Sequence, residues 1–373
     1  MNVLICVNTL NYGMGGVSTH IMDLCKGYST SNVIEQVILC CDGGEHIDTI
    51  KSVEKLEYIQ IPFHDYGLSF MGILYGYSKL KKIVKKYGID IVHVHSQRII
   101  PQAYLLKLLD KVPFIWTNHI DAIPNEKMMK FMCRTMKFPI ISVSQQLKNM
   151  MVEKYKCNSN KVYVVNNGID LSRFAPLTDR EKAETEKRYS INREQTPYVI
   201  SLLSRINEGK GQDRLLKAIS LSSYKSKIKV IIAGHTYSTT EKYKQQLEEY
   251  ARLNQIDTCF LDFSNPREVF GVSDLFVLPS RYEGFALVCI EALAMGCAVI
   301  RTRTPGYQEM QKWTEIVEID DVLDLSRKID EAIENDFNKE KTKLGRDSVF
   351  TLFTKEKCAE NTLNVYKKVI KCK

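Results

Sequence analysis

The sequence predicts an α/β protein with two Rossmann-like domains facing a central cleft, each built on a parallel, doubly wound sheet. Three observations predict it. The chain of 373 residues is too long for one ordinary hydrophobic core and suits two. Short runs rich in Val and Ile alternate with helix-length amphipathic segments, as expected for buried parallel strands joined by helices. The alternation breaks near Asn166 and then starts again.

The first half of the chain contains the first series of strands. Six short apolar runs are predicted to be strands, at residues 3–7, 37–41, 89–95, 114–118, 140–143 and 163–165. Amphipathic segments at residues 18–27 and 78–87 are predicted to be helices. This series defines an N-terminal domain over residues 1–170.

The second half repeats the pattern after a turn signal at Asn166-Asn167-Gly168. Residues 178–194 are densely charged and predict a solvated helix. Strands are expected at residues 198–203, 229–233, 258–260, 275–278 and 298–301, with helices at 211–220, 241–254 and 286–295. This second domain covers residues 171–354. The remaining helical tail, residues 355–373, is expected to pack back on the first domain.

Composition favours a soluble globular protein. Hydrophobic residues make up 44% of the chain and charged residues 26%, with a net charge of +8. The eleven cysteines include no C-x-x-C pair, which favours reduced, buried thiols and a cytoplasmic location. The first residues suggest a strand rather than a signal peptide, and no apolar run is long enough to predict a membrane span.

Two glutamates interrupt the apolar segment at residues 281–300. Glu283 lies on the loop after a predicted strand, and Glu291 lies inside the helix that follows. The N–H groups of the first helical turn favour an anion there. A phosphate in this place would have carboxylates on both sides to accept hydrogen bonds from hydroxyl groups, which suits a sugar nucleotide. An acid near a helix N-terminus and a second acid at a solvent edge is the competing structural explanation.

Three further clusters follow predicted strands. Arg205 and Lys210 flank a glycine turn, where two cations could neutralise a diphosphate without a metal, although solvated loop cations are common. Gly15 and Gly16 permit close backbone approach to a ligand, but the dinucleotide-binding spacing is absent. His119 follows the end of another predicted strand, on the side of the expected cleft, and a single histidine is more often structural than catalytic.

Taken in order, these clusters make the chain resemble a retaining glycosyltransferase of family 4 with the GT-B fold. The matching stretches are GGV at 15–17, ISVSQQLK at 141–148, NNGIDLSRF at 166–174, SRINEGKG at 204–211, AGH at 233–235 and PSRYEGFALVCIEALAMGCAVI at 279–300. The last contains the E-x7-E signature of the family and is the most specific of them.

The resemblance implies a role for each candidate residue. His119, Arg205, Lys210 and Glu283 would be catalytic, with the two cations stabilising the leaving diphosphate and His119 contacting the transferred sugar. The donor would also be held by Gly15, Gly16, Gly234, Phe285, Ala286, Leu287 and Glu291, the last at the ribose. The chain departs from the family pattern at two positions, since Ala286 and Ser204 stand where the family often has glycine. Their side chains are expected to narrow the donor pocket.

The implied activity is transfer of a sugar from a nucleotide-diphosphate sugar to a glycan acceptor. The acceptor is expected to be lipid-linked, in the synthesis of a bacterial surface polysaccharide such as O-antigen, capsule or lipopolysaccharide. The leaving phosphate would assist deprotonation of the acceptor, so Glu283 is not expected to be a covalent nucleophile. No metal or other cofactor is expected, since the chain has no D-x-D clamp. A sugar-nucleotide epimerase or hydrolase on the same fold, and a non-catalytic sugar-nucleotide-binding scaffold, are the alternatives.

Two basic amphipathic segments are candidates for contact with an anionic membrane surface. Residues 78–87 contain five lysines, and residues 126–138 place Lys127, Lys130, Arg134 and Lys137 at helical spacing between Met and Phe residues. Ordinary helices packed on the sheet, with their lysines in water, explain the pattern equally well. No module for nucleic-acid binding is found.

Overall fold

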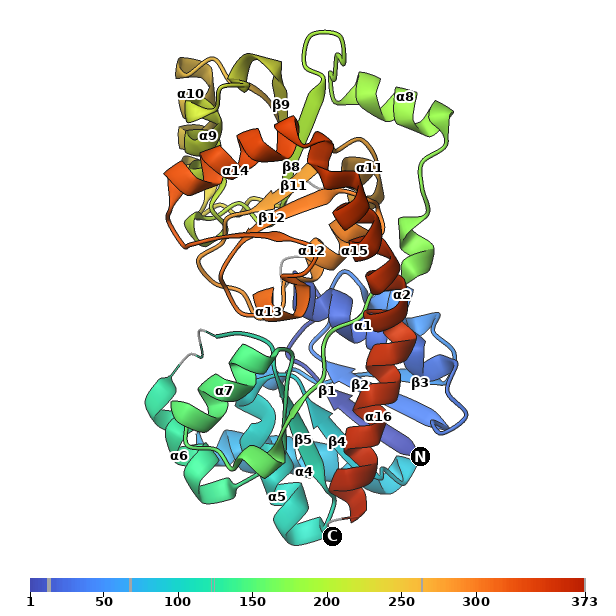
Figure 1. Ribbon diagram of the computed structural model, residues 1–373. Coiled ribbons are helices and arrows are strands. Elements are labelled where there is room, and N and C mark those ends of the chain that lie inside the picture. The colour runs from blue at the N-terminus through green and yellow to red at the C-terminus, as the bar shows by residue number, and fades with distance from the viewer. Residues whose placement is uncertain (12–14, 67–68, 122, 124, 263, 372–373) are drawn as a thin grey trace. The chain divides into compact units, whose positions relative to one another are not determined.

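The computed structural model describes residues 1–11, 15–66, 69–121, 123, 125–262 and 264–371. The chain divides into two compact units (Figure 1). The N-terminal unit comprises Met1–Gly168 and Thr354–Lys373, and the C-terminal unit comprises Ile169–Phe353. Each unit is built on its own parallel sheet, which confirms the predicted fold class.

The sheet of the N-terminal unit has the order β3-β2-β1-β4-β5-β6-β7, and all its pairs are parallel. Its strands are β1 (Asn2–Cys6), β2 (Gln36–Cys41), β3 (Leu56–Gln60), β4 (Ile91–Val94), β5 (Phe114–Asn118), β6 (Ile140–Ser142) and β7 (Val162–Val164). Its helices are α1 (Gly16–Ser29), α2 (Ile47–Lys51), α3 (Phe63–Tyr66), α4 (Phe70–Tyr87), α5 (Ile100–Asp110), α6 (Glu126–Met136), α7 (Gln145–Glu153) and α16 (Lys355–Lys371).

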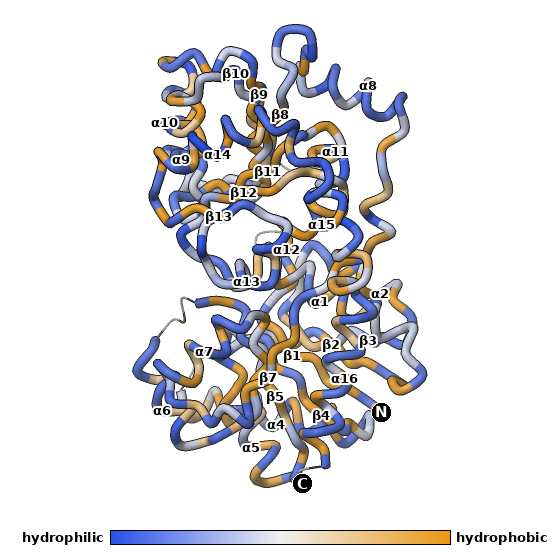
Figure 2. The backbone as a smooth tube through the Cα atoms, in the orientation of Figure 1, coloured by the Kyte–Doolittle hydropathy of each residue, from blue (hydrophilic) through white to orange (hydrophobic). Residues whose placement is uncertain are grey.

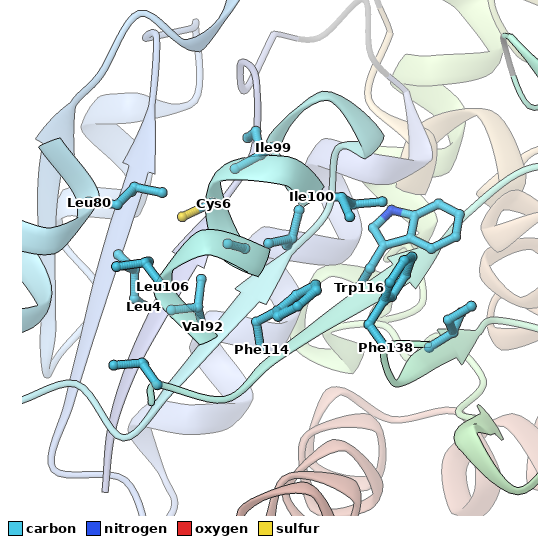
Figure 3. Close-up of a cluster of buried hydrophobic side chains, with 14 of the residues drawn as sticks. Leu4, Cys6, Leu80, Val92, Ile99, Ile100, Leu106, Phe114, Trp116 and Phe138 are labelled. Carbon is cyan, nitrogen blue, oxygen red and sulfur yellow. The ribbon is translucent and has the colours of Figure 1, made fainter. Parts of the chain in front are cut away.

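Alternating side chains of the central strands build a core on each face of this sheet. Leu4 and Cys6 of β1 join Val92, Phe114 and Trp116 on one face, under α4 and α5 (Figure 3). Val3 and Ile5 lie on the other face, in the cluster that α1 and α16 cover. The C-terminal helix α16 lies beside α1 (Figure 1), and the hydroxyl groups of Tyr28 and Tyr366 are 2.9 Å apart.

The sheet of the C-terminal unit has the order β10-β9-β8-β11-β12-β13, again with all pairs parallel. Its strands are β8 (Tyr198–Leu203), β9 (Ile228–Ala233), β10 (Asp257–Leu261), β11 (Leu275–Leu278), β12 (Ala298–Thr302) and β13 (Glu315–Val317). Its helices are α8 (Asp179–Arg188), α9 (Gln212–Leu221), α10 (Glu241–Leu253), α11 (Pro266–Gly271), α12 (Leu287–Ala294), α13 (Tyr307–Met310), α14 (Val322–Glu334) and α15 (Lys339–Leu352).

The buried strands are hydrophobic, whereas the charged helix α8 is mostly hydrophilic (Figure 2). A capping box begins α8, since Thr178 and Glu181 each accept a hydrogen bond from the backbone of the other. The sequence analysis missed β3 and β13. Both are edge strands whose side chains are mostly half-buried and include Glu or Gln, so they do not form the continuous apolar runs of the central strands.

Candidate functional site

The loops after β8 and β11 meet where the connections of the C-terminal sheet diverge. β8 lies between β9 and β11 in the sheet, so chain segments leaving β8 and β11 turn toward opposite sides. Ligands of doubly wound sheets bind at the carboxyl ends of the strands at such a switch point. The backbone N–H of Arg281 donates to the carbonyl of Gly209 at 2.8 Å and joins the two loops.

Lys210 and Glu283 form an ion pair between these loops. The Lys210 Nζ lies 2.6 Å from Oε1 of Glu283, and the two side chains are only 20% and 10% exposed. Partial burial strengthens such a pair relative to one at the surface. Lys210 ends the short 3-10 helix η5 (Glu208–Lys210). The two residues are 73 positions apart in the sequence, so the adjacency of β8 and β11 creates their contact.

Arg205 lies on the same loop as Lys210, with its side chain exposed. Its carbonyl accepts a hydrogen bond of 2.9 Å from Nε2 of Gln212, which also donates to the Ser204 hydroxyl at 3.0 Å. Gln212 is fully buried. It therefore fixes the backbone of the loop while leaving the guanidinium of Arg205 at the surface.

Helix α12 begins at a turn that the Glu283 loop forms. Its N-cap, Ala286, has φ 61° and ψ 68°, and no side chain caps the first turn. The positive end of the helix dipole is therefore left for another acceptor. Glycine adopts this left-handed conformation at lower cost than alanine. This cost gives a physical reason for the glycine that the family often has at position 286.

Glu291 lies inside α12 and is only 6% exposed. Its Oε1 is 4.0 Å from the guanidinium of Arg173, which belongs to the 3-10 helix η4 (Leu171–Phe174). A glutamate at a solvent edge, the competing explanation above, does not fit this burial. Glu291 is instead a buried carboxylate with a cation at its side.

Gly234 follows β9 and packs against the loop that carries Arg205. A Cβ atom at Gly234 would lie 1.7 Å from the carbonyl oxygen of Ser204, and the backbone φ there is +157°. The N–H of Ser204 donates to the carbonyl of Ala233 at 3.0 Å. Glycine at this position thus has a packing role that positions the Arg205 loop, in addition to the donor contact that the resemblance implies.

Arg301 and Gly306 pack against the backbone of the turn at Phe285. Arg301 is buried and donates to the carbonyls of Thr304 and Pro305 at 3.1 and 3.0 Å, and more distantly to that of Phe285 at 3.5 Å. Gly306, with φ +89°, leaves so little room that a Cβ atom would lie 2.6 Å from the carbonyl oxygen of Phe285.

We expect Gly306→Ala to lower the free energy of unfolding of the C-terminal unit by about 2–3 kcal/mol. The added methyl group meets the backbone of Phe285 and adds to the strain of a left-handed alanine. Gly296→Ala is the matched control, since Gly296 has φ +82° but no atom within 4 Å of its Cβ position. It should cost only the backbone strain, about 1–2 kcal/mol. Urea unfolding of both variants tests this, and equal losses would contradict the contact with Phe285.

The predicted site residues of the N-terminal unit lie near the carboxyl ends of β1 and β5. Gly15 is the N-cap of α1 with φ 57°, and Gly16 is the first residue of the helix. Residues 12–14, including Gly13 of the same glycine-rich turn, lie outside the described residues. His119 follows β5, and its Nε2 lies 2.9 Å from Nδ1 of His95.

The surroundings of His119 keep its imidazole neutral. Burial, with smaller contributions from His20 and His93, holds the pKa of His119 well below its usual value. Burial likewise lowers the pKa of His20 to about 4. Two imidazoles in contact share a hydrogen bond most favourably when both are neutral.

Sequence reasoning missed several residues that the structure brings to these sites. His20 and His95 contact His119, and Arg301 holds the Phe285 turn. The HVH stretch at residues 93–95 was the available signal for the histidines. No local pattern identifies Arg301, because its partners are carbonyl groups that the folded chain brings together.

Comparison with known proteins identifies two family models that together match most of the chain. Residues 14–173 match "Glycosyltransferase Family 4" and residues 183–348 match "Glycosyl transferases group 1". D-inositol 3-phosphate glycosyltransferase of Corynebacterium jeikeium is 27% identical over 243 residues, which is 58% of this chain and 57% of that protein. The matched segment thus spans little more than half of that relative.

Solved structures share the fold over the whole length. A glycosyltransferase from Rickettsia africae superimposes with a TM-score of 0.88 at 22% identity, covering 100% of this chain and 99% of that one. Anabaena HepE, solved in complex with UDP and glucose, has a TM-score of 0.82 at 16% identity, covering 99% and 100%. The two parallel sheets, the paired Lys210 and Glu283 and the matched models agree: the chain belongs to glycosyltransferase family 4 and has the GT-B fold.

Proposed function

We propose that this protein is a retaining hexosyltransferase that moves a sugar from a nucleotide-diphosphate sugar to a glycan acceptor. The observation that carries the proposal is the ion pair of Lys210 and Glu283 beside the uncapped start of α12. One site thus offers a cation and free amides for a diphosphate and a carboxylate for sugar hydroxyl groups. The Anabaena structure, solved with UDP and glucose, supports a uridine diphosphate sugar as the first donor to test.

In the proposed reaction, the bond between the anomeric carbon and the diphosphate oxygen breaks. Negative charge grows on the leaving diphosphate and positive charge on the sugar ring. Lys210, Arg205 and the amides of Phe285, Ala286 and Leu287 stabilise the first, as preorganised dipoles and cations do in other enzymes. No metal is needed for this role. Glu283 accepts hydrogen bonds from the donor sugar. The oxygen of the acceptor hydroxyl forms the new bond to the anomeric carbon on the face that the diphosphate leaves, which retains the configuration, and the leaving phosphate takes the hydroxyl proton.

The residues with less direct support keep the roles that the resemblance implies. Glu291 binds the ribose, with Arg173 close to its carboxylate. Gly15 and Gly16 approach the phosphates, Gly234 lies beside the donor, and His119 contacts the transferred sugar. The N-terminal unit binds the acceptor, for which we propose a lipid-linked glycan of a bacterial surface polysaccharide such as O-antigen, capsule or lipopolysaccharide.

A screen of donors tests the proposal. The full chain is incubated with UDP-, GDP-, ADP- and TDP-sugars, and its melting temperature is measured. A donor at 100 times its Kd should stabilise the protein by about 2.7 kcal/mol. Donor consumption is then followed with and without glycan acceptors. If no nucleotide sugar raises the melting temperature at millimolar concentration, the proposed function is wrong.

The same screen separates the alternatives. An epimerase or hydrolase would consume the donor equally well without an acceptor, whereas a scaffold would bind the donor and leave it intact. The proposed transferase requires the acceptor for rapid turnover. The ion pair of Lys210 and Glu283 favours an enzyme over a scaffold. Burying two charges costs desolvation free energy, so the pair contributes little to folding stability, and a role in catalysis explains its presence better.

We also propose peripheral attachment to the cytoplasmic face of an anionic membrane through α4 and α6. No helix in the described part of the chain is long and apolar enough to cross a bilayer. The exposed face of α4 presents Phe70, Met71 and Tyr75, followed by Lys79, Lys82, Lys85 and Lys86. In α6, Met129 and Met132 are buried in the core, while Phe131 is exposed between Lys127 and Arg134.

Replacing Lys79 and Lys82 by alanine is expected to weaken vesicle binding about 30-fold, since each lysine near an anionic surface contributes about 1 kcal/mol. Sedimentation with vesicles that contain a third phosphatidylglycerol measures the change. The control replaces the exposed Lys339 and Lys343 of α15 and should leave binding unchanged. Equal weakening by both double variants, or no binding by the natural protein, would exclude attachment through α4.

A further inference from the structure

Three histidines from separate elements meet in the N-terminal unit. β1, β4 and β5 are consecutive neighbours in the sheet. His95 directly follows β4, His119 directly follows β5, and His20 lies in α1, the helix after β1. The carboxyl ends of three adjacent parallel strands therefore bring these side chains together.

The rings are close enough to share one ligand. One nitrogen from each ring can be chosen so that all three lie within 4.8 Å of one another, and His95 Nδ1 and His119 Nε2 are 2.9 Å apart. A tetrahedral zinc ion with bonds of about 2.0–2.1 Å places its ligand nitrogens about 3.4 Å apart. The separation of 2.9 Å is shorter than this value and the limit of 4.8 Å is longer, so binding requires rotation of the rings and replaces the hydrogen bond between His95 and His119.

Two nitrogens in the group are buried and lack a hydrogen-bond partner among the described residues. These are Nδ1 of His20 and Nε2 of His95, whose side chains are more than nine-tenths buried. Buried polar atoms in native proteins nearly always have a partner. Nδ1 of His20 therefore calls for a ligand, and so does His95, whose Nδ1 is shared with His119 while its Nε2 has no partner among the described residues.

The neighbouring His93 shows what a purely structural histidine looks like in the same place. Its Nδ1 lies 2.5 Å from the hydroxyl of Tyr366, and its Nε2 lies 2.6 Å from that of Thr117. Both nitrogens of His93 are thus occupied, and none remains for a metal ion. His93 therefore serves as an internal comparison for the other three.

We propose that His20, His95 and His119 bind one divalent transition-metal ion, with zinc as the preferred ion. Imidazole nitrogen is a good ligand for zinc, cobalt and nickel, whereas magnesium and calcium prefer oxygen. Three protein ligands leave the fourth position of a tetrahedral ion open to water or another small ligand. The ion links α1 to the ends of β4 and β5, so it stabilises the N-terminal unit.

The proposed metal site shares His119 with the proposed sugar contact, but its ligands are distinct from the cations proposed for the diphosphate. The cations proposed for the diphosphate belong to the C-terminal unit, and metal binding requires neither donor nor acceptor. A chain that failed as a transferase would still bind the ion, and a chain without the ion could still bind a nucleotide sugar. The two proposals therefore fail independently.

Metal binding by the full chain tests the inference. The chelator-treated protein is dialysed against Zn²⁺, and bound metal is measured. We expect one ion per chain and a higher melting temperature with Zn²⁺ than without it. His20→Gln, His95→Gln and His119→Gln should each weaken binding about 100-fold or more, since even changes beyond the ligands cost 10- to 100-fold. The controls His93→Gln and His235→Gln should keep one ion per chain.

The cobalt form gives a second measurement that needs no variant. Co²⁺ bound by three imidazoles should show the visible bands of a four-coordinate ion without a thiolate charge-transfer band in the near ultraviolet. A thiolate band would assign the metal to cysteines instead and overturn the proposal. So would the absence of stoichiometric Zn²⁺ binding, or binding that persists when His20, His95 and His119 are replaced together.

Discussion

Replacing Lys210 by alanine is expected to lower kcat for sugar transfer about 10²- to 10³-fold, a loss of about 3–4 kcal/mol of transition-state stabilisation. The ammonium group lies 2.6 Å from Glu283 and is largely buried, so water replaces it poorly. Its removal leaves the charge that develops on the leaving diphosphate without its nearest cation. It also leaves the carboxylate of Glu283 without its partner, which further disfavours an anionic ligand.

The control for this prediction is Lys217→Ala. Lys217 lies on α9, is half exposed and pairs with Asp213 at 3.4 Å, so its loss should change kcat less than about twofold. Lys210→Arg should recover part of the lost activity, since it restores the charge with a different shape. Steady-state rates with the donor found by the thermal screen measure all three. Lys210→Ala with the kcat of the natural protein would remove Lys210 from the catalytic site.

Replacing Arg301 by methionine is expected to lower the free energy of unfolding of the C-terminal unit by about 3–5 kcal/mol. Arg301 is 1% exposed, and its hydrogen bonds run to neutral groups: the carbonyls of Thr302, Thr304 and Pro305 and the Thr304 hydroxyl. Methionine has a similar length but no donors. Several buried acceptors are therefore left unpaired, each at a cost of about 1–3 kcal/mol.

The two tryptophans of the chain allow this loss to be assigned to one unit. Trp116 lies in the N-terminal unit and Trp313 in the C-terminal unit, so a Trp116→Phe background reports on the latter alone by fluorescence in urea. Arg303→Met is the control, because Arg303 is exposed and pairs with Glu318 at the surface; its cost should stay within about 0.5 kcal/mol. A similar small cost for Arg301→Met would show that the Phe285 turn does not depend on Arg301.

Local sequence patterns were sufficient to locate the central strands and some of the helices that join them; α5, α7, α11, α14 and α15 were not predicted. The ranges 114–118, 198–203 and 275–278 match β5, β8 and β11 to the residue, because fully buried parallel strands form continuous apolar runs bounded by turn residues. The edge strands β3 and β13 carry mixed residues and were missed, whereas the edge strands β7 and β10 were predicted. The helix predicted at residues 78–87 was shorter than α4, which begins at Phe70. The exposed apolar side chains of Phe70, Met71 and Tyr75 interrupt the periodic pattern in the first part of this helix.

The candidate site could be predicted only in part. Strand ends and glycine turns placed Lys210 and Glu283 near a common ligand, but their direct pairing depends on β8 and β11 being neighbours. In the same way, single histidines at positions 20, 95 and 119 carry little information until the order of β1, β4 and β5 joins them.

The sequence by itself determined the two α/β units, the strands at their centres and the residue types able to bind a diphosphate and a sugar. These properties follow from hydrophobic periodicity and local turn chemistry, which act over a few residues. Only the tertiary structure decided which of those residues are in contact, which groups accept hydrogen bonds from Arg301, and that three histidines lie together. The order of strands in a parallel sheet sets these contacts, and it depends on packing between segments far apart in the chain.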